Sequence, residues 1–423
     1  MQIISDNDFA SAMKEFLIAE GECMAVGVSG GADSICLCRM LDRYAKKYGC
    51  KVLALTVDHR LRPESAFEAE QVHNWLSALG IPHKTLVWEG DKPLTGIEEK
   101  ARLARYDLLT AECKKQKIRL LCLAHNKNDN VETFYMRLAK SSGVDGLSGI
   151  RHRSVRNGVT VLRPLLGFTR EEIKATNKAM GQEWIEDPSN ENEMYERVRF
   201  RKAKSFFDDL GLSIDAVAKT MEKMAGVSTY LQKLQKDFCR RYVLVSDFGF
   251  LKINLPHLLN LDNEIAERVL AECISAVGKN GEYTYPLQTA KVCRLLAQIK
   301  QKDFKKTTLG GTKIIKKEKN KWLHIIKEER STEDKKEITE EHIVWDRFSL
   351  DFEGVMPTAL YVEKLGNTSL PDNLKEVKKL FPADVLKTVP AVRDKDGLLF
   401  VPLLGYKRDS DLKCKCTFNP FCF

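Results

Sequence analysis

Short apolar runs alternate with amphipathic stretches along the first part of the chain, up to Lys140. The apolar runs predict four strands, at Cys23–Val28, Lys51–Val57, Lys84–Trp88 and Ile118–Ala124. The other stretches repeat apolar residues at helical spacing and predict helices from Asp33 onward and over Glu64–Leu79, Gly96–Lys114 and Asn128–Lys140. Strands that alternate with helices indicate right-handed βαβ units. The pattern therefore predicts an α/β fold whose doubly wound sheet is mostly parallel.

The pattern changes after the short polar segment Asp208–Gly211. The residues that follow predict a mainly helical second domain that ends in a lysine-rich β-hairpin, Lys313–Lys317 with Lys321–Ile326. The run Lys327–Glu341 is charged and nearly free of apolar residues, so we expect a solvated linker there. The remainder predicts a small α+β module with short strands, among them Phe348–Phe352, Ala359–Val362 and Leu398–Val401. We therefore expect three domains, at residues 1–210, 211–330 and 340–423.

A glycine-rich turn stands between the first predicted strand and the first predicted helix, and it reads Ser29-Gly30-Gly31-Ala32-Asp33-Ser34. A strand, a glycine turn and a helix start together point backbone N–H groups and the positive end of a helix dipole at an anion. Two adjacent glycines let the backbone approach a phosphate without a Cβ in between. The turn lacks the lysine of a P-loop and the spacing of a dinucleotide fingerprint. It therefore predicts a phosphate site of another kind.

Asp33 is the unusual residue of this turn. Its carboxylate would repel a polyphosphate unless a divalent cation lay between them, and Mg²⁺ commonly binds one or two carboxylates together with substrate phosphates. We therefore expect Asp33 to be a Mg²⁺ ligand. The alternative is an aspartate N-cap on an ordinary α/β turn, in which serine and glycine are present only as turn residues.

Two further polar loops follow predicted strands, at Asp58–Arg62 and at His125. Ligands of doubly wound sheets bind at the carboxyl ends of the strands, so one cleft can contain both loops and the Ser29–Ser34 turn. Asp129 and Glu132 stand three residues apart at a helix start, so both carboxylates can face the same side. They are candidates for a metal or general-base cluster. Acidic residues in a first helical turn are equally typical of simple dipole stabilisation.

Basic residues recur at two places near this predicted cleft. Arg102 and Arg105 share one face of the helix Gly96–Lys114, where they are either solvated or, for Arg105, placed over the cleft. The segment Tyr195–Lys202 has alternating basic residues, and it would present a cationic row to phosphates. The formal net charge of +9 permits nucleic-acid binding without requiring it, because the electrostatic attraction depends on clustering.

The composition is that of an ordinary globular protein, and 423 residues suffice for two or three domains. No apolar run approaches the ~20 residues of a membrane span. The first residues, Met1–Asp8, do not form a basic-then-apolar signal peptide. We therefore expect a cytoplasmic protein without membrane contact. Among the twelve cysteines, Cys414, Cys416 and Cys422 lie close together but lack a nearby fourth ligand for a metal.

The Ser29–Ser34 turn matches the Ser-Gly-Gly-x-Asp-Ser signature of the PP-loop ATP pyrophosphatases. A longer set of motifs resembles one family of that group, the tRNA(Ile)-lysidine synthetases. The further matching motifs are Asp58–Arg62, Glu99-x-x-Arg102-x-x-Arg105-Tyr106, Ala124-His125 through Glu132-Thr133, Met136–Leu138, Gly143–Leu147, Arg163–Leu166 and Trp184-x-x-Asp187–Asn190. The resemblance is strong over the first half. The middle helices with Leu309-Gly310-Gly311 are similar to the family's substrate-binding domain, and Val401–Gly405 is similar to its C-terminal module.

The resemblance implies an ATP-dependent ligase that modifies tRNA. Members of the family adenylate the C2 oxygen of the wobble cytidine of a CAU-anticodon tRNA(Ile) and release pyrophosphate. Free L-lysine then displaces AMP to form lysidine, and Mg²⁺ is required. A turn that holds the β- and γ-phosphates as a leaving group, without a P-loop lysine, suits attack at the α-phosphorus. The sequence leaves the oligomeric state open, a homodimer included.

Carried over residue by residue, the resemblance implies roles for named side chains. ATP is expected to bind at Ser29, Gly30, Gly31, Ala32, Asp33 and Ser34, with Asp33 on the metal. Catalytic or substrate-facing roles are expected of Asp33, Arg105, His125, Asp129, Glu132 and Arg197. Contacts with tRNA are expected of Arg199, Arg201, Lys313 and Lys316, because they are basic and follow the predicted site or lie on the hairpin.

Three residues depart from the family pattern and keep alternatives open. Asn128 and Asn130 stand where the family usually has Asp and Gln, and Val198 interrupts an Arg-Asn-Arg run. The loss of a charge beside Asp129 raises the alternative of a catalytically silent tRNA-binding relative. A cytidine-thiolating PP-loop enzyme is the other alternative, although such enzymes use a Cys-x-x-Cys pair that this sequence lacks.

Overall fold

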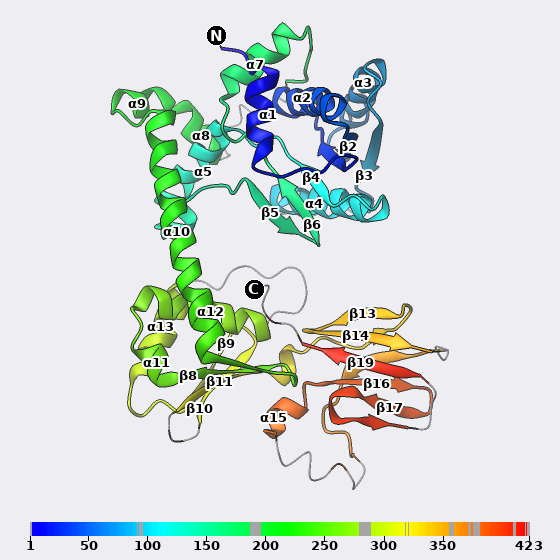
Figure 1. The fold of residues 1–423 in the computed structure, drawn as a ribbon, viewed down its shortest axis with the longest axis vertical. Coiled ribbons are helices and arrows are strands. Elements are labelled where there is room, and N and C mark those ends of the chain that lie inside the picture. The colour runs from blue at the N-terminus through cyan, green and yellow to red at the C-terminus, as the bar shows by residue number, and fades with distance from the viewer. Residues whose placement is uncertain are drawn as a thin grey trace. The chain divides into compact units, whose positions relative to one another are not determined.

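A computed structural model of the chain describes residues 2–90, 92, 96–186, 196–278, 289–317, 319, 321–354, 359–370, 374, 381–408, 412–418 and 420 (Figure 1). The chain divides into two compact units, Met1–Thr229 and Tyr230–Phe423. The boundary between them falls within one long helix, α10 (Ile214–Tyr242).

The first unit is built on a six-stranded sheet with the strand order β3-β2-β1-β4-β6-β5. Its strands are β1 (Cys23–Gly27), β2 (Lys51–Asp58), β3 (His83–Val87), β4 (Leu120–Cys122), β5 (Arg153–Arg156) and β6 (Val159–Leu162). All neighbouring strands run parallel except β5, which pairs antiparallel with β6. The predicted α/β fold with a mostly parallel sheet is confirmed.

Helices cover both faces of this sheet (Figure 1). One face packs against α1 (Asp6–Lys14), α2 (Ala32–Tyr48), α3 (Ser65–Ala78) and α7 (Arg170–Ala179), and the other packs against α4 (Ile97–Lys115). The chain places β2 on one side of β1 and β4 on the other, so the strand order reverses at β1. Crevices at such a reversal hold the ligands of doubly wound sheets. The Ser29–Ser34 turn follows β1 and His125 follows β4, so both lie at this point.

The rest of the first unit is helical. It comprises α5 (Lys127–Ala139), α6 (Val144–Leu147), α8 (Glu196–Lys202), α9 (Lys204–Asp209) and the first part of α10. Tyr135 of α5 stacks on Phe207 of α9 with ring centroids 4.3 Å apart, and on Phe200 of α8 at 5.9 Å. These contacts fix α8, and with it the basic residues of that helix, against the start of α5.

The second unit combines helices with three antiparallel sheets. The first sheet has the order β7-β8-β11-β10-β9 and is accompanied by three helices; its elements are β7 (Val243–Ser246), β8 (Phe250–Asn254), β11 (Trp322–Lys327), β10 (Thr312–Lys317), β9 (Lys306–Leu309), α11 (Leu255–Leu259), α12 (Asn263–Gly278) and α13 (Thr289–Lys300). The next sheet has the order β12-β15-β16-β17-β18, with β12 (Lys336–Glu337), β15 (Tyr361–Lys364), β16 (Pro390–Asp394), β17 (Gly397–Val401) and β18 (Tyr406–Lys407). The last sheet has the order β13-β14-β19, with β13 (His342–Trp345), β14 (Phe348–Glu353) and β19 (Lys413–Thr417). The short helix α15 (Ala383–Leu386) precedes β16.

The prediction of a solvated linker at Lys327–Glu341 is wrong. Lys327 ends β11 and is completely buried, and its Nζ lies 2.9 Å from the Gly278 carbonyl oxygen and 3.2 Å from Asp346 Oδ2. Ile338 is also buried. The segment is therefore anchored to the second unit at Lys327, Glu328, Thr332 and Ile338, whereas Asp334–Glu337 and Thr339–Glu341 are exposed. One apolar cluster of this unit runs from Phe238 to Phe418. The division into three domains stays a prediction.

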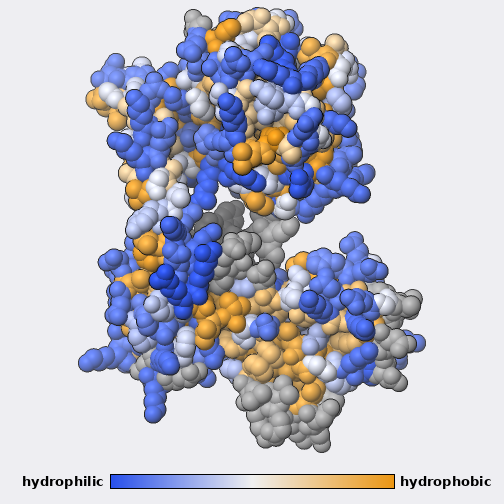
Figure 2. Space-filling view, viewed as in Figure 1, coloured by the Kyte–Doolittle hydropathy of each residue, from blue (hydrophilic) through white to orange (hydrophobic). Residues whose placement is uncertain are grey.

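Hydrophilic side chains cover much of the molecular face seen in Figure 2, with apolar residues between them. Within the described part of the chain, no helix is both long enough and apolar enough to span a membrane. Cys414 and Cys416 are half-buried free thiols on β19, whereas Cys422 lies outside the described residues.

Candidate functional site

The Ser29–Ser34 turn is held by its own hydrogen bonds. The Ser29 N–H donates to Ser34 Oγ at 3.1 Å, and that hydroxyl donates to the Gly31 carbonyl at 3.0 Å. Gly30 has φ +88°, and a Cβ there would lie 2.7 Å from Ile185 Cδ1, so only glycine fits without a shift. Gly31 is the N-cap of α2 and makes no side-chain cap bond. The first N–H groups of α2 therefore point at the crevice without a capping acceptor.

Asp33 lies inside the first turn of α2 and does not cap it, so the N-cap alternative is wrong. Its Oδ1 is buried and has no hydrogen-bond partner in the structure. Burial and the neighbouring Asp129 carboxylate raise the pKa of Asp33 to about 6, while Arg170 and Arg201 act in the opposite direction. A buried carboxylate whose pKa lies this close to neutral pH, and whose oxygen has no partner, is well suited to receive a cation.

Asp33 lies near the Asp129 carboxylate at the start of α5, and Glu132 stands three residues further along that helix; we call Asp33, Asp129 and Glu132 the carboxylate cluster. Arg170 Nη2 donates to Asp129 Oδ1 at 3.0 Å, and Arg201 Nε donates to Glu132 Oε1 at 3.1 Å. Glu132 is buried, and its Oε2 has no hydrogen-bond partner in the structure. The two guanidinium groups thus pair with Asp129 and Glu132, whereas Asp33 forms no ion pair within the described part of the chain.

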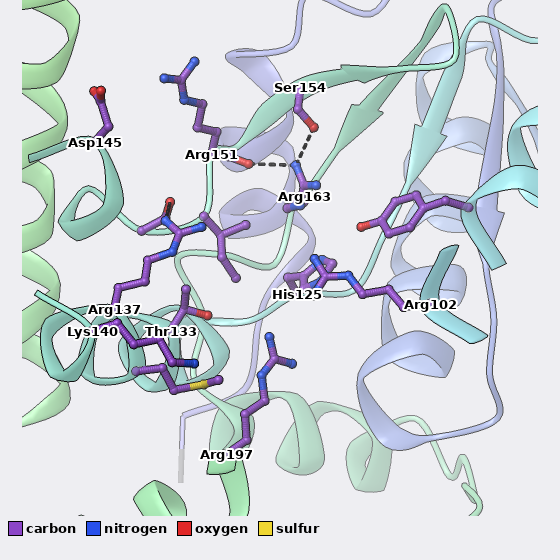
Figure 3. Close-up of a pocket in the computed structure, with 14 residues that line it drawn as sticks. Arg102, His125, Thr133, Arg137, Lys140, Asp145, Arg151, Ser154, Arg163 and Arg197 are labelled. Atoms are coloured by element: carbon purple, nitrogen blue, oxygen red, sulfur yellow. Dashed lines mark hydrogen bonds between the residues drawn. The ribbon is translucent and has the colours of Figure 1, made fainter. Parts of the chain in front are cut away.

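A cavity with a volume of about 490 Å³ opens beside His125, which follows β4, and beside Thr133 of α5. Six basic side chains and one acidic side chain line it; the basic ones are Arg102, Arg137, Lys140, Arg151, Arg163 and Arg197, and the acidic one is Asp145 (Figure 3). We call this cavity the cationic pocket. Arg163 is held at its wall by donating to the Arg151 carbonyl at 2.9 Å and to Ser154 Oγ at 3.0 Å. The positive charge of the cationic pocket favours an anionic ligand.

His125 lines the cationic pocket, between Arg163 and Arg197 in Figure 3. Burial lowers its pKa to about 3, and the charges of Arg163, Arg105 and Arg197 act in the same direction. The imidazole is therefore neutral at physiological pH, and its buried Nδ1 has no hydrogen-bond partner in the structure. A neutral ring with an unbonded nitrogen can form a hydrogen bond to an uncharged polar group, such as a nucleobase edge.

The carboxylate cluster and the cationic pocket share one turn. His125 lines the pocket, and the next residue, Asn126, accepts from the Asp129 N–H at 2.9 Å as the N-cap of α5. One turn further, Glu132 belongs to the cluster and Thr133 lines the pocket. An anion-selecting cavity and a cation-selecting group of carboxylates therefore lie on two sides of the same helix start.

The sequence matches known proteins over this unit and beyond it. A family model described as a PP-loop domain matches residues 2–204. The tRNA(Ile)-lysidine synthase of Wolbachia pipientis wMel is 34% identical over 411 residues, which cover 94% of this chain and 92% of that protein. The tRNA(Ile)-lysidine synthase of Anaplasma marginale (strain St. Maries) is 33% identical over 409 residues, with 89% and 85% covered. The chain belongs to the tRNA(Ile)-lysidine synthase family.

The departures from the family pattern have structural explanations. Asn128 Oδ1 accepts from the backbone N–H of Arg170 at 3.0 Å, and Asn130 Oδ1 accepts from that of Ile150 at 2.6 Å. Both asparagines therefore hold backbone at the edges of the site. Val198 is buried on α8, where an asparagine side chain would need a polar partner. The three departures therefore leave Asp33, Asp129 and Glu132 of the carboxylate cluster unchanged.

Most residues expected at the site lie in one of its two parts. Asp33, Asp129 and Glu132 form the carboxylate cluster, and His125 and Arg197 line the cationic pocket. Arg105 is half-buried on α4, and its charge lowers the pKa of both His59 and His125. Asp187–Asn190 and Tyr195 of the expected motifs lie outside the described residues.

The four residues expected to contact tRNA have different surroundings. Arg199 is exposed on α8, while Arg201 is bonded to Glu132. In the second unit, Lys313 Nζ lies 2.8 Å from Asp384 Oδ1, and Lys316 Nζ donates to the Gln301 carbonyl at 3.2 Å. A role for these four residues in tRNA binding stays a prediction.

Arg170 is the main member of the site that sequence reasoning missed. It follows Thr169, the N-cap of α7, and the capping box there accounts for the local sequence by itself. The sequence motifs contain Arg163 and Arg137 but assign neither of them a role in the site. Their common signal is a basic residue at the end of a strand or on the inner face of a helix, and that signal becomes decisive only when the fold brings the residues together.

Proposed function

We propose that this protein is an ATP-dependent ligase that forms lysidine at the wobble cytidine of a CAU-anticodon tRNA(Ile). The observation that carries the proposal is the match to a tRNA(Ile)-lysidine synthase over 94% of the chain, which includes the region beyond the PP-loop domain. The reaction has two steps. The cytidine C2 oxygen attacks the α-phosphorus of ATP and releases pyrophosphate, and the amine of L-lysine then attacks C2 and releases AMP.

The Ser29–Ser34 turn is the proposed site of the departing pyrophosphate. The N–H groups at the start of α2 are donors for phosphate oxygens, and the left-handed Gly30 lets the backbone come close. Because the turn has no lysine, its donors act through the backbone and need no proton change as the leaving group departs. Donors fixed in this way stabilise the charge that develops on the leaving phosphates.

The residues present fit a magnesium ion. Asp33 Oδ1 and Glu132 Oε2 are buried carboxylate oxygens without partners, and oxygen ligands are those that Mg²⁺ prefers. The described residues contain no group of three or more His, Cys, Asp or Glu side chains placed to hold a metal alone. Asp33 would therefore hold the ion together with phosphate oxygens. When bound, Mg²⁺ would neutralise charge on the phosphates.

The cationic pocket is the proposed site of the anticodon loop around the wobble cytidine. An unpaired base of a tRNA loop must leave its stack to be modified, and its flanking phosphates then need cations. His125 would contact the base through Nδ1, which has no protein partner. With a pKa of about 3 the ring is a poor proton acceptor at neutral pH, so we assign it to hydrogen bonding.

Both amino groups of L-lysine are ammonium cations at neutral pH, so the cationic pocket would repel them. The carboxylate cluster is the better site, because Asp129 and Glu132 supply negative charge one helical turn from the pocket. The lysine amine would then approach the cytidine across the shared α5 start. Arg199, Arg201, Lys313 and Lys316 are proposed to contact tRNA phosphates.

The test is a direct assay of the whole reaction. The protein is incubated with ATP, Mg²⁺, labelled L-lysine and a CAU-anticodon tRNA(Ile) transcript, and with a matched transcript whose wobble cytidine is uridine. Label on the first transcript alone is the expected result. Pyrophosphate release without label would contradict lysine transfer and favour another PP-loop reaction. Tight tRNA binding with neither product would indicate the catalytically silent relative.

A further inference from the structure

A chain of hydrogen bonds runs from the surface of α3 to the backbone just before the Ser29–Ser34 turn. The buried Thr56 of β2 donates through Oγ1 to the Val28 carbonyl at 2.8 Å. His83 of β3 places Nε2 at 2.8 Å from the same hydroxyl. On its other side, His83 Nδ1 lies 3.1 Å from Nδ1 of His73 on α3. Two histidines and a threonine thus connect an exposed helix to the end of β1.

Chemistry fixes the direction of these bonds. A carbonyl only accepts, so the Thr56 proton lies toward Val28, and the hydroxyl oxygen must accept from an N–H on His83 Nε2. Burial lowers the pKa of His83 to about 4, and the neighbouring His73 acts in the same direction. The neutral ring then carries its lone pair on Nδ1, which accepts from the Nδ1–H of His73. Every donor in the chain therefore points toward Val28.

The Val28 carbonyl and the Ser29 N–H belong to one planar peptide group. Thr56 holds the oxygen of this group, and Ser34 Oγ accepts from its nitrogen at 3.1 Å. The helix that carries His73 also contacts the turn directly, because Val72 Cγ2 lies 3.0 Å from where a Cβ on Gly30 would be. The orientation of the first peptide of the turn is thus set from both ends.

We propose that His83 is a positioning residue for the nucleotide-binding turn, acting through Thr56 to hold the Val28–Ser29 peptide in the orientation that phosphate binding requires. The inference rests on the proposed use of ATP by this turn. His83 acts without contacting the reacting atoms, so its effect belongs to ATP binding. Loss of the Nε2 donor leaves the Thr56 hydroxyl free to rotate away from Val28, and the peptide then loses one of its two restraints.

Steady-state kinetics of the full chain test this role. His83→Leu is expected to raise the KM for ATP about three- to tenfold, the effect of one hydrogen bond, with little change in kcat or in the KM for lysine and tRNA. His83→Gln retains an N–H donor and is expected to restore the KM for ATP to within about twofold. Thr56→Val is expected to match His83→Leu, and the double variant to be no worse than either. Thr85→Val, at the position paired with Thr56 on β3, is the control.

The outcomes separate this inference from the proposed function. Wild-type protein that does not consume ATP would overturn the proposed function itself. Active wild type together with an unchanged KM for ATP in a folded His83→Leu variant would overturn the positioning role. A parallel rise in all three KM values, or no rescue by glutamine, would also overturn it in favour of a general structural role. If His83→Leu does not fold, Thr56→Val and His83→Gln decide in the same way.

A spectroscopic measurement tests the direction of the hydrogen bonds. The ¹⁵N shifts of His83 in the free protein should show the Nε2-protonated neutral ring, and an Nδ1-protonated ring would contradict the chain of hydrogen bonds.

Discussion

The guanidinium of Arg170 joins α7 to α5 by donating to Asp129 at 3.0 Å, and its other terminal nitrogen lies 3.6 Å from Glu132. The side chains of Arg170 and Asp129 are only 20% and 16% exposed, so this pair is largely removed from water. One cation thus supports two members of the carboxylate cluster. Its charge also acts to lower the pKa of Asp33.

Arg170→Gln is the first test of this arrangement. Removing Arg170 leaves the largely buried Asp129 without its cation, while Glu132 keeps Arg201, so we expect a loss of stability of about 1–3 kcal/mol in the first unit. The pKa of Asp33 should rise above about 6, because a charge that lowers it is gone. The acidic limb of the adenylation pH profile should therefore move to higher pH. Arg170→Lys keeps the charge and should keep the limb in place; an equal shift in both variants would contradict the electrostatic explanation.

The difference between Arg170 and the Ser29–Ser34 turn shows which part of the site the sequence can predict. The turn, the preceding strand and the following helix are contiguous, so their spacing alone predicts a phosphate site. Arg170 lies 41 residues from Asp129, and its local sequence is explained by a helix cap. Short strands are a mixed case: the sequence predicts those near β14, β15 and β17 individually, but it does not single out β5, β7, β8, β16 or β19. Spacing along the chain predicts that His125 and Glu132 lie near the cleft and the family resemblance implies their roles, whereas their burial and unbonded atoms are seen only in the fold.

Asp33→Asn is expected to stabilise the protein in the absence of ligands, by an amount that grows from about pH 4 and is complete above about pH 6. The folded pKa of about 6 exceeds the ordinary value of 3.8, so the unfolded carboxyl loses its proton first as the pH rises. Below about pH 4 both states are protonated and Asp33 contributes nothing. Between pH 4 and 6 the folded state loses stability, and above that range a constant penalty of about 1–3 kcal/mol remains. The neutral asparagine never incurs it.

Thermal unfolding of both proteins in chelator, at pH 4 and pH 8, measures this difference. We expect equal midpoints at pH 4 and a higher midpoint for the variant at pH 8. Addition of Mg²⁺ with ATP should stabilise the wild type more than the variant, and adenylation by the variant should be lost while its affinity for tRNA is nearly unchanged. Equal midpoints at both pH values would contradict the raised pKa. A normal adenylation rate would contradict the metal role.

Arg197→Gln tests the cationic pocket. If Arg197 contacts a phosphate of the anticodon loop, its loss should weaken tRNA binding and reduce the slope of log K against log salt by about one. The KM for lysine should stay unchanged, because lysine is assigned to the carboxylate cluster. Arg43→Gln is the control, since Arg43 is half-exposed and pairs with Asp6 on the far helices α1 and α2. Equal salt slopes for the two variants would contradict a phosphate contact at Arg197.

Lys313 of β10 offers a test in which affinity should increase. Its Nζ is 2.8 Å from Asp384 Oδ1, and both side chains are partly exposed, so a tRNA phosphate would have to compete with this carboxylate. Asp384→Asn removes the competitor and should strengthen tRNA binding by about two- to fivefold, as for a surface ion pair. Lys313→Gln should weaken binding and reduce the salt slope by about one. If Asp384→Asn leaves the affinity unchanged while Lys313→Gln lowers it, the competition is absent.

Lys327→Met tests the buried ion pair between Lys327 and Asp346, at the start of the charged segment Lys327–Glu341. A run rich in charged residues normally predicts solvation, but this lysine is completely buried against Asp346, which also accepts from Arg347 at 2.7 Å. Burial lowers the pKa of Lys327, and the Asp346 carboxylate acts to raise it. Methionine fills a similar volume but leaves Asp346 with one cation fewer, so we expect a cost of about 2–4 kcal/mol to the second unit.

The control is Lys321→Met, at an exposed position before β11, which should cost almost nothing. Urea unfolding followed by tryptophan fluorescence, to which the buried Trp345 beside Asp346 contributes, measures both variants. An equal loss in the two would show that the buried pair contributes no more than a surface charge.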